Sequence, residues 1–162
     1  MIPYYKPAKL TETMFWWRAH DILESGYYTK GNLSAKLSLL IAERTHYKFA
    51  VPFGSGTQAL FLLAKWYWKK GYRKIRCPAF TWPSTYEPFR WLGYQVRFVD
   101  IDRETWLADF GDWVPDIDEL FIPVDTFGNV FQRANLAPSA GPIIDSAQSL
   151  GAAWPHQEMG DR

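Results

Sequence analysis

Apolar residues recur at helical spacing in the first part of the chain, and short apolar runs alternate with helical segments after it. Met14 and Trp17 can share one helix face, Leu37 and Ile41 can share another, and Asn32 is the expected N-cap of the second helix. The pattern predicts helices over residues 10–24, 32–48, 58–70 and 84–92, and strands over 49–53, 74–77, 95–100, 119–124 and 142–145. Strand–helix alternation is typical of parallel sheets with flanking helices, so the predicted fold class is α/β.

The composition suits one globular domain over residues 1–162. Hydrophobic residues make up 48% of the chain and charged residues 22%, and no repeat or Ser/Gly linker interrupts it. The aromatic fraction of 18% predicts a heavily packed core, with an oligomer contact as a second use of the aromatic excess. The formal net charge is only +1, which argues against a nucleic acid or an anionic membrane as partner.

The single cysteine, Cys77, excludes an intramolecular disulfide and fits a reducing compartment. The first twenty residues lack the apolar segment and cleavage site of a secretion signal, and no run approaches the ~18 apolar residues of a membrane span. We therefore expect a soluble cytoplasmic protein.

Ligands in open parallel sheets bind beyond the carboxyl ends of the strands, which here are residues 54–57, 80–85, 125–129 and 145–148. In the first of these turns, backbone N–H groups at a helix start, with the hydroxyls of Ser55 and Thr57, would attract an anion such as a phosphate. The turn matches neither a P-loop nor GxGxxG, and its small residues are equally suited to turning the chain.

Two further strand ends carry candidate ligand-binding side chains. Trp82 lies in a loop with two prolines, where it could stack on a ligand ring or else pack on the core. Asp145 ends an apolar strand, with Gln148 three residues later. The carboxylate could pair with a cationic ring nitrogen, and the amide could bond a neighbouring oxygen; alternatively, Asp145 caps the following turn.

No metal site is predicted. His20, His46 and His156 show no metal-ligand spacing to one another. Asp100 and Asp102 resemble a metal pair but follow a strand at turn spacing, so we interpret them as structural.

Taken in order, these segments resemble the pyridoxal 5'-phosphate (PLP) sugar aminotransferases of the DegT/DnrJ/EryC1/StrS type. The similarity covers residues 24–152, and its motifs are GYYTKG, SGTQAL, PAFTWPST, GYQVRFVDID, IPVDTFGN and DSAQSLGA. The resemblance implies an incomplete large domain of the PLP aminotransferase fold, a mostly parallel sheet with flanking helices, without the C-terminal small domain.

The resemblance also assigns roles to individual residues. Gly56 and Thr57, with Ser55 beside them, match the turn that holds the cofactor phosphate. Trp82 matches the aromatic residue that stacks on the pyridine ring. Asp145 matches the carboxylate that keeps the ring nitrogen protonated, and Gln148 matches the amide on the ring-hydroxyl side.

The sequence departs from the family after Gln148: the Schiff-base lysine expected there is absent, as are its neighbouring Ser, the remaining strands and the small domain. The last lysine is Lys74, and His156 lies too near Gln148 to replace the missing residue. The chain is therefore interpreted as part of a split or interrupted aminotransferase, inactive until another polypeptide completes it. A degenerate remnant and a repurposed binding or assembly module are the other interpretations.

The resemblance implies amino transfer to a keto-sugar nucleotide, with glutamate as the donor and an active site at a homodimer interface. The alternative function is that of a non-catalytic module that binds a phosphate or nucleotide at residues 54–57.

Overall fold

The computed structural model describes residues 11–29, 31–111, 114–132 and 143–152. These residues form two compact units that divide after Pro52. Three parallel strands with flanking helices make up the second unit, which confirms the predicted α/β class. Within the described residues, no helix is both long and apolar enough to span a bilayer.

The first unit holds two helices close to their predicted positions. Helix α1 covers Glu12–Ser25, and Gly26 ends it in the left-handed conformation (φ 68°) that glycine adopts without strain. Helix α2 covers Asn32–Thr45. Its N-cap is Gly31 rather than the predicted Asn32, and it ends before Lys48 because His46 takes a left-handed φ of 57°.

The predicted strand at 49–53 is wrong. The structure has no strand there, and Phe49 is 76% exposed. An apolar run becomes a strand only where a neighbour completes its hydrogen-bond ladder, and the described residues provide no such neighbour for this segment.

The second unit begins with helix α3, Gly56–Lys69, followed by strand β1, Lys74–Pro78. The helix predicted at 84–92 is a 3₁₀ turn, η1 (Pro83–Thr85), followed by the short helix α4 (Glu87–Trp91). Strand β2 covers Gln95–Val99. The sheet order is β2-β1-β3, with Ile75 opposite Val96 and Leu120.

Strand β3 covers only Glu119–Phe121. The Ile122 N–H still donates to the Arg76 carbonyl (2.9 Å), but the next residue of β1 on this side, Pro78, has no N–H group with which to extend the ladder. Beyond β3, Val124 and Asp145 form a single parallel bridge. The Asp145 N–H donates to the Pro123 carbonyl and the Asp125 N–H donates to the Asp145 carbonyl, each over 3.0 Å. The predicted strand at 142–145 is thus reduced to its end, and residue 142 lies outside the described residues. A second 3₁₀ turn, η2 (Thr126–Gly128), follows.

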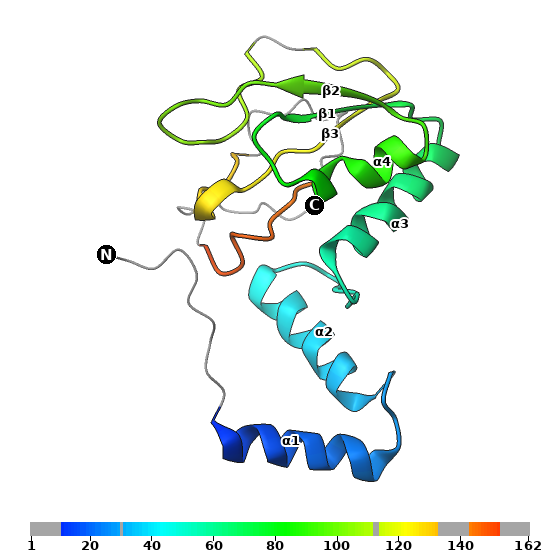
Figure 1. Ribbon diagram of the computed structural model, residues 1–162, viewed down its shortest axis with the longest axis vertical. Coiled ribbons are helices and arrows are strands. Elements are labelled where there is room, and N and C mark those ends of the chain that lie inside the picture. The colour runs from blue at the N-terminus through cyan, green and yellow to red at the C-terminus, as the bar shows by residue number, and fades with distance from the viewer. Residues whose placement is uncertain (1–10, 30, 112–113, 133–142, 153–162) are drawn as a thin grey trace. The chain divides into compact units, whose positions relative to one another are not determined.

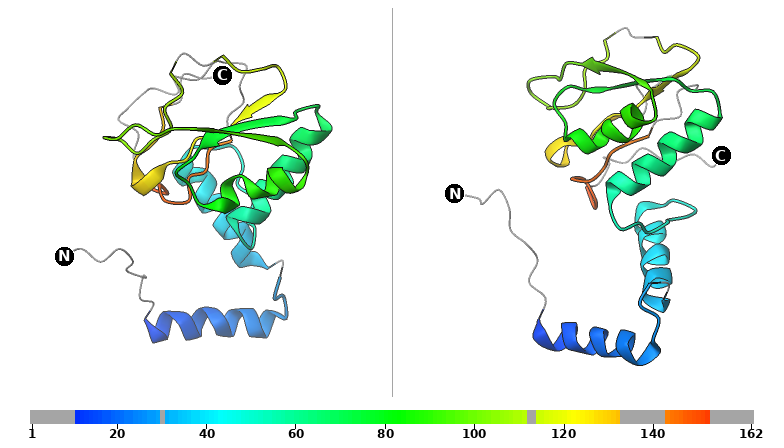
Figure 2. Two further views of the ribbon diagram at one scale, coloured as in Figure 1. Left: turned by 45° about the horizontal axis from the view of Figure 1, so that its top comes forward. Right: turned by 45° about the vertical axis from the view of Figure 1, so that its right-hand side comes forward.

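Helices α3 and α4 cover the same face of the sheet (Figures 1 and 2). The core lies between them and the strands, and its buried residues are Leu60, Ala64, Ile75, Cys77, Phe89, Tyr94, Leu120, Ile122 and Ile143. This packing holds the carboxyl ends of the strands, where ligands are expected, on a rigid support.

Candidate functional site

The turn before α3 is built by a reciprocal cap. The Ser55 Oγ accepts a hydrogen bond from the Gln58 N–H (3.2 Å), and the Gln58 Oε1 accepts one from the Gly54 N–H (3.1 Å). The cap leaves the N–H groups of Gly56 and Thr57, which have no intrahelical acceptor, at the positive end of the helix. A side chain added at Gly56 would meet no atom within 4 Å, so the space beside this residue is open. The turn can therefore receive an anion.

The loop after β1 presents Trp82 to solvent. Its side chain is 78% exposed, so it does not pack on the core, which was the other interpretation. Trp82 is the N-cap of η1, and its carbonyl accepts a hydrogen bond from the Thr85 N–H over 3.0 Å. Trp82 thus stands at the start of a short, hydrogen-bonded turn, and Pro83 follows it directly.

Asp145 is joined to that same turn. The Thr85 Oγ1 donates to the Asp145 Oδ2 over 2.7 Å, and the Thr85 side chain is completely buried. The Thr81 hydroxyl lies 2.8 Å from that of Thr85. The other carboxylate oxygen, Oδ1, accepts from the Ala147 N–H (3.3 Å), so Asp145 also caps the following turn. Both sequence-based interpretations of Asp145 are thus compatible.

Gln148 is oriented by the η2 turn. Its Oε1 accepts a hydrogen bond from the Phe127 N–H over 2.7 Å. Phe127 has a left-handed φ of 56°, an unfavourable conformation for a bulky residue. Because the amide oxygen is occupied, the Gln148 Nε2 is the atom left to donate to a ligand.

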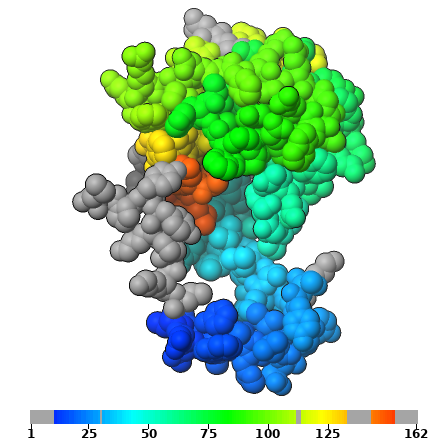
Figure 3. All heavy atoms as spheres, in the orientation of Figure 1, coloured from blue at the N-terminus to red at the C-terminus, as the bar shows by residue number. Residues whose placement is uncertain are grey.

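Asp125 was not singled out from the sequence, yet it organises the segment after Asp145. Its buried carboxylate accepts hydrogen bonds from the Ser146 Oγ (2.8 Å), the Ser149 Oγ (2.7 Å) and the Phe131 N–H (2.9 Å). On the molecular surface, residues 145–150 lie beside the η2 segment (Figure 3). The motif IPVDTFGN, an apolar strand ending in a carboxylate, was the signal that could have identified it.

Of the two aspartates after β2, Asp102 caps the turn that follows the strand. The Asp102 Oδ1 accepts from the Thr105 N–H (2.8 Å), the Thr105 Oγ1 (2.8 Å) and the Glu104 N–H (3.1 Å). These hydrogen bonds, chiefly the backbone one from Thr105, lower the pKa of Asp102. The described residues contain no group of three or more side chains suited to a metal ion; His156 lies outside them.

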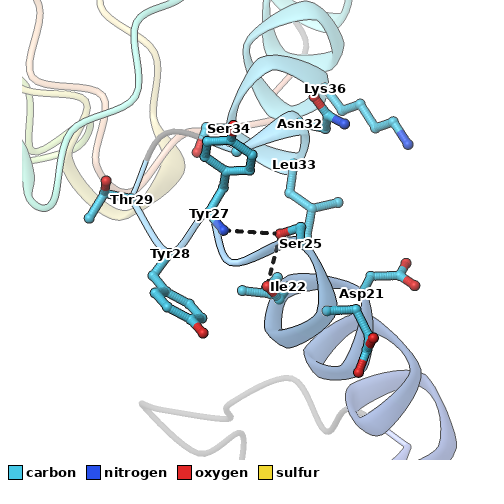
Figure 4. A pocket seen from close by; sticks show the side chains of 12 residues that line it. Asp21, Ile22, Ser25, Tyr27, Tyr28, Thr29, Asn32, Leu33, Ser34 and Lys36 are labelled. Atoms are coloured by element: carbon cyan, nitrogen blue, oxygen red, sulfur yellow. Dashed lines mark hydrogen bonds between the residues drawn. The ribbon is translucent and has the colours of Figure 1, made fainter.

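A separate hollow of about 640 Å³ lies in the first unit, between the end of α1 and the start of α2 (Figure 4). The motif GYYTKG runs along it, and Lys30 of that motif is outside the described residues. The Ser25 Oγ donates to the Ile22 carbonyl (2.8 Å) and accepts from the Tyr27 N–H (3.2 Å), which shapes the turn. Tyr28 points away from α2.

Comparison with known proteins identifies the family. The profile of the DegT/DnrJ/EryC1/StrS aminotransferase family matches residues 12–162. The chain belongs to this family. The expected resemblance is therefore confirmed, and it extends over α1 as well.

Curated members of the DegT/DnrJ/EryC1/StrS family are about 30% identical to this chain over the aligned residues. A GDP-4-keto-6-deoxy-D-mannose 3-dehydratase of Escherichia coli O55:H7 is 29% identical over 95% of this chain and 43% of its own length. A UDP-4-amino-4-deoxy-L-arabinose–oxoglutarate aminotransferase of Shewanella sediminis is 32% identical over 86% of this chain and 38% of its own. The chain thus spans less than half the length of these relatives.

Solved structures show the same partial match. A GDP-4-keto-6-deoxymannose-3-dehydratase with a trapped PLP-glutamate geminal diamine superposes with a TM-score of 0.82, at 24% identity, over 96% of this chain and 44% of that one. The Escherichia coli enzyme with bound hydrated PLP gives 0.68, at 27% identity, over 79% and 35%. The fold is therefore part of the sugar aminotransferase fold.

Proposed function

We propose that this chain is the N-terminal part of the PLP-binding domain of an enzyme that transfers an amino group to a keto-sugar nucleotide. The observation that carries the proposal is the hydrogen bond that joins Asp145 to the turn presenting Trp82. Relatives named for GDP- and UDP-linked sugars, and a related structure with PLP and glutamate, support the substrate and donor classes.

The chemistry of these residues fits PLP. Ser55, Gly56 and Thr57 offer hydroxyl and N–H donors to its phosphate at the start of α3. Trp82 offers a solvent-exposed aromatic face to the pyridine ring, and Asp145 offers a carboxylate to the ring nitrogen.

When bound, PLP supplies an electron sink for a substrate carbanion. The carboxylate of Asp145 holds the proton on the ring nitrogen, which that role requires. The Nε2 of Gln148, left to donate because Phe127 occupies the amide oxygen, orients the ring-hydroxyl side.

The lysine needed for catalysis is proposed to come from a further polypeptide segment or a complementing chain. No lysine follows Lys74 in the sequence. Lys74 itself lies at the amino end of β1, opposite the edge that carries the site, and its Nζ contacts Asp116 (3.0 Å) and Asp118 (2.9 Å). The assembled protein is proposed to be a cytoplasmic homo-oligomer or a complex of two chains.

Titration of the 162-residue chain with PLP, followed by cofactor absorbance, tests this function. We expect weak, reversible binding and no phosphopyridoxyl-lysine at a specific position after borohydride reduction. Trp82→Ala should weaken binding about 2- to 10-fold through lost stacking. Asp145→Ala should weaken it about 10- to 100-fold, because a charge-assisted hydrogen bond is lost.

Matched controls make the test specific. Trp91→Ala removes another exposed tryptophan, at the end of α4, and Asp102→Asn alters a carboxylate engaged in a turn. Neither should change PLP affinity. Equal binding of PLP, inorganic phosphate and nucleotides would favour the phosphate-binding module, and a single labelled lysine would refute the non-covalent mode.

A further inference from the structure

Thr85 is a buried hydroxyl with two polar neighbours and no exposure to water. It belongs neither to the phosphate turn nor to the groups that face a cofactor ring. Its side chain nevertheless contacts the carboxylate of Asp145, and its backbone N–H contacts the carbonyl of Trp82.

The direction of the hydrogen bonds follows from the chemistry of the groups. An ionised carboxylate can only accept, so the single proton of the Thr85 hydroxyl goes to the Asp145 Oδ2. Thr85 can then only accept from the Thr81 hydroxyl, 2.8 Å away. The result is a chain from Thr81 through Thr85 to Asp145, in which each bond polarises the next toward the carboxylate.

We propose that Thr85 is a positioning residue for the cofactor, and this role rests on the proposed function. Its hydroxyl holds the carboxylate of Asp145 at a fixed distance from the turn that presents Trp82. One buried residue thereby contacts both groups, the carboxylate of Asp145 through its side chain and the turn that presents Trp82 through its backbone N–H. Thr85 does not itself touch the cofactor and acts through Asp145.

The test separates the hydroxyl from the space it fills. Thr85→Val keeps the volume and removes the donor, whereas Thr85→Ser keeps the donor. We expect Thr85→Val to weaken PLP binding about tenfold, as loss of a hydrogen bond to a charged group would, and Thr85→Ser to restore most of the affinity. The matched control is Thr45→Val in α2, which should leave PLP affinity unchanged: the part-buried Thr45 hydroxyl donates to the Ile41 carbonyl, and neither residue belongs to the proposed site.

A PLP analogue with carbon in place of the ring nitrogen distinguishes positioning from general damage to the fold. Because it presents nothing for Asp145 to bond, its affinity should be the same in Thr85→Val and in the unaltered chain. If the unaltered chain binds PLP but Thr85→Val leaves that affinity unchanged, or weakens PLP and the analogue equally, the role of Thr85 is refuted and the proposed function stands. If the unaltered chain does not bind PLP, the proposed function fails, and the role of Thr85 with it.

Discussion

Tyr94 ties the sheet to helix α3, and its two contributions can be measured separately. Its hydroxyl donates to the carbonyl of Ala64 in the middle of α3 over 2.8 Å. Its ring packs edge-on against Trp68 (5.0 Å between ring centroids) and Phe89 (5.3 Å) and is almost completely buried. Burial raises the pKa of Tyr94 to about 12, so at pH 7 the side chain is neutral in both the folded and unfolded states.

Tyr94→Phe should lower the free energy of unfolding by about 1 kcal/mol, the typical net value of one hydrogen bond. The cost stays small because the Ala64 carbonyl keeps its acceptor role within the helix. Tyr94→Ala removes the ring as well and should cost about 3–5 kcal/mol, as other large-to-small core substitutions do.

Urea unfolding at pH 7, followed by far-ultraviolet circular dichroism, measures both changes. Tyr27→Phe, which alters an exposed ring in the first unit, should stay within about 0.5 kcal/mol of the unaltered chain. Equal losses for Tyr94→Phe and Tyr94→Ala would assign the stabilisation to the hydroxyl. A loss below about 1 kcal/mol for Tyr94→Ala would refute the packing of α3 on this residue.

Three further predictions concern the buried groups Cys77 and Glu119. Burial raises the pKa of the Cys77 thiol to about 12, so a thiol reagent at pH 8 should modify it only after unfolding in urea. As the pH rises from about 8.5 toward 12, the unfolded chain releases a thiol proton that the folded chain retains; urea midpoints should therefore fall with pH, and less so in Cys77→Ala. Glu119→Gln removes a buried charge that contacts the Arg76 Nε (3.0 Å) and the partly exposed Arg97 (3.6 Å), and should cost about 2 kcal/mol in urea unfolding. An unchanged midpoint would show that this charge is dispensable.

Helical periodicity and strand–helix alternation predicted those elements of the fold that depend on neighbouring residues in the sequence. The periodicity before Gly26 identified α1, and the alternation after residue 70 identified the parallel strands. The apolar run at 49–53 looked equally clear and was wrong. Strand formation depends on a partner elsewhere in the chain, and a local pattern contains no information about that partner.

The candidate site likewise contains residues that the sequence identified and residues whose roles only the structure shows. Trp82, Asp145 and Gln148 could be found because each follows a strand or lies in a distinctive loop. Thr85 and Asp125 also lie in such motifs, PAFTWPST and IPVDTFGN, but their roles could not be predicted from the sequence. Those roles come from partners far along the chain: Thr85 bonds a carboxylate 60 residues away, and Asp125 bonds hydroxyls 21 and 24 residues away.

These long-range hydrogen bonds bear on whether cofactor binding and catalysis can be separated in this protein. The carboxylate of Asp145 is held by Thr85, and the segment that carries Gln148 is held by Asp125, entirely within the chain. The groups proposed to face the PLP ring are therefore ordered without any contribution from a catalytic lysine. On the proposed function, a complementing segment would supply proton transfer to a ring site that is already formed. Its addition should raise the turnover number. The loss of PLP affinity caused by substituting Trp82 or Asp145 should stay about the same with and without it.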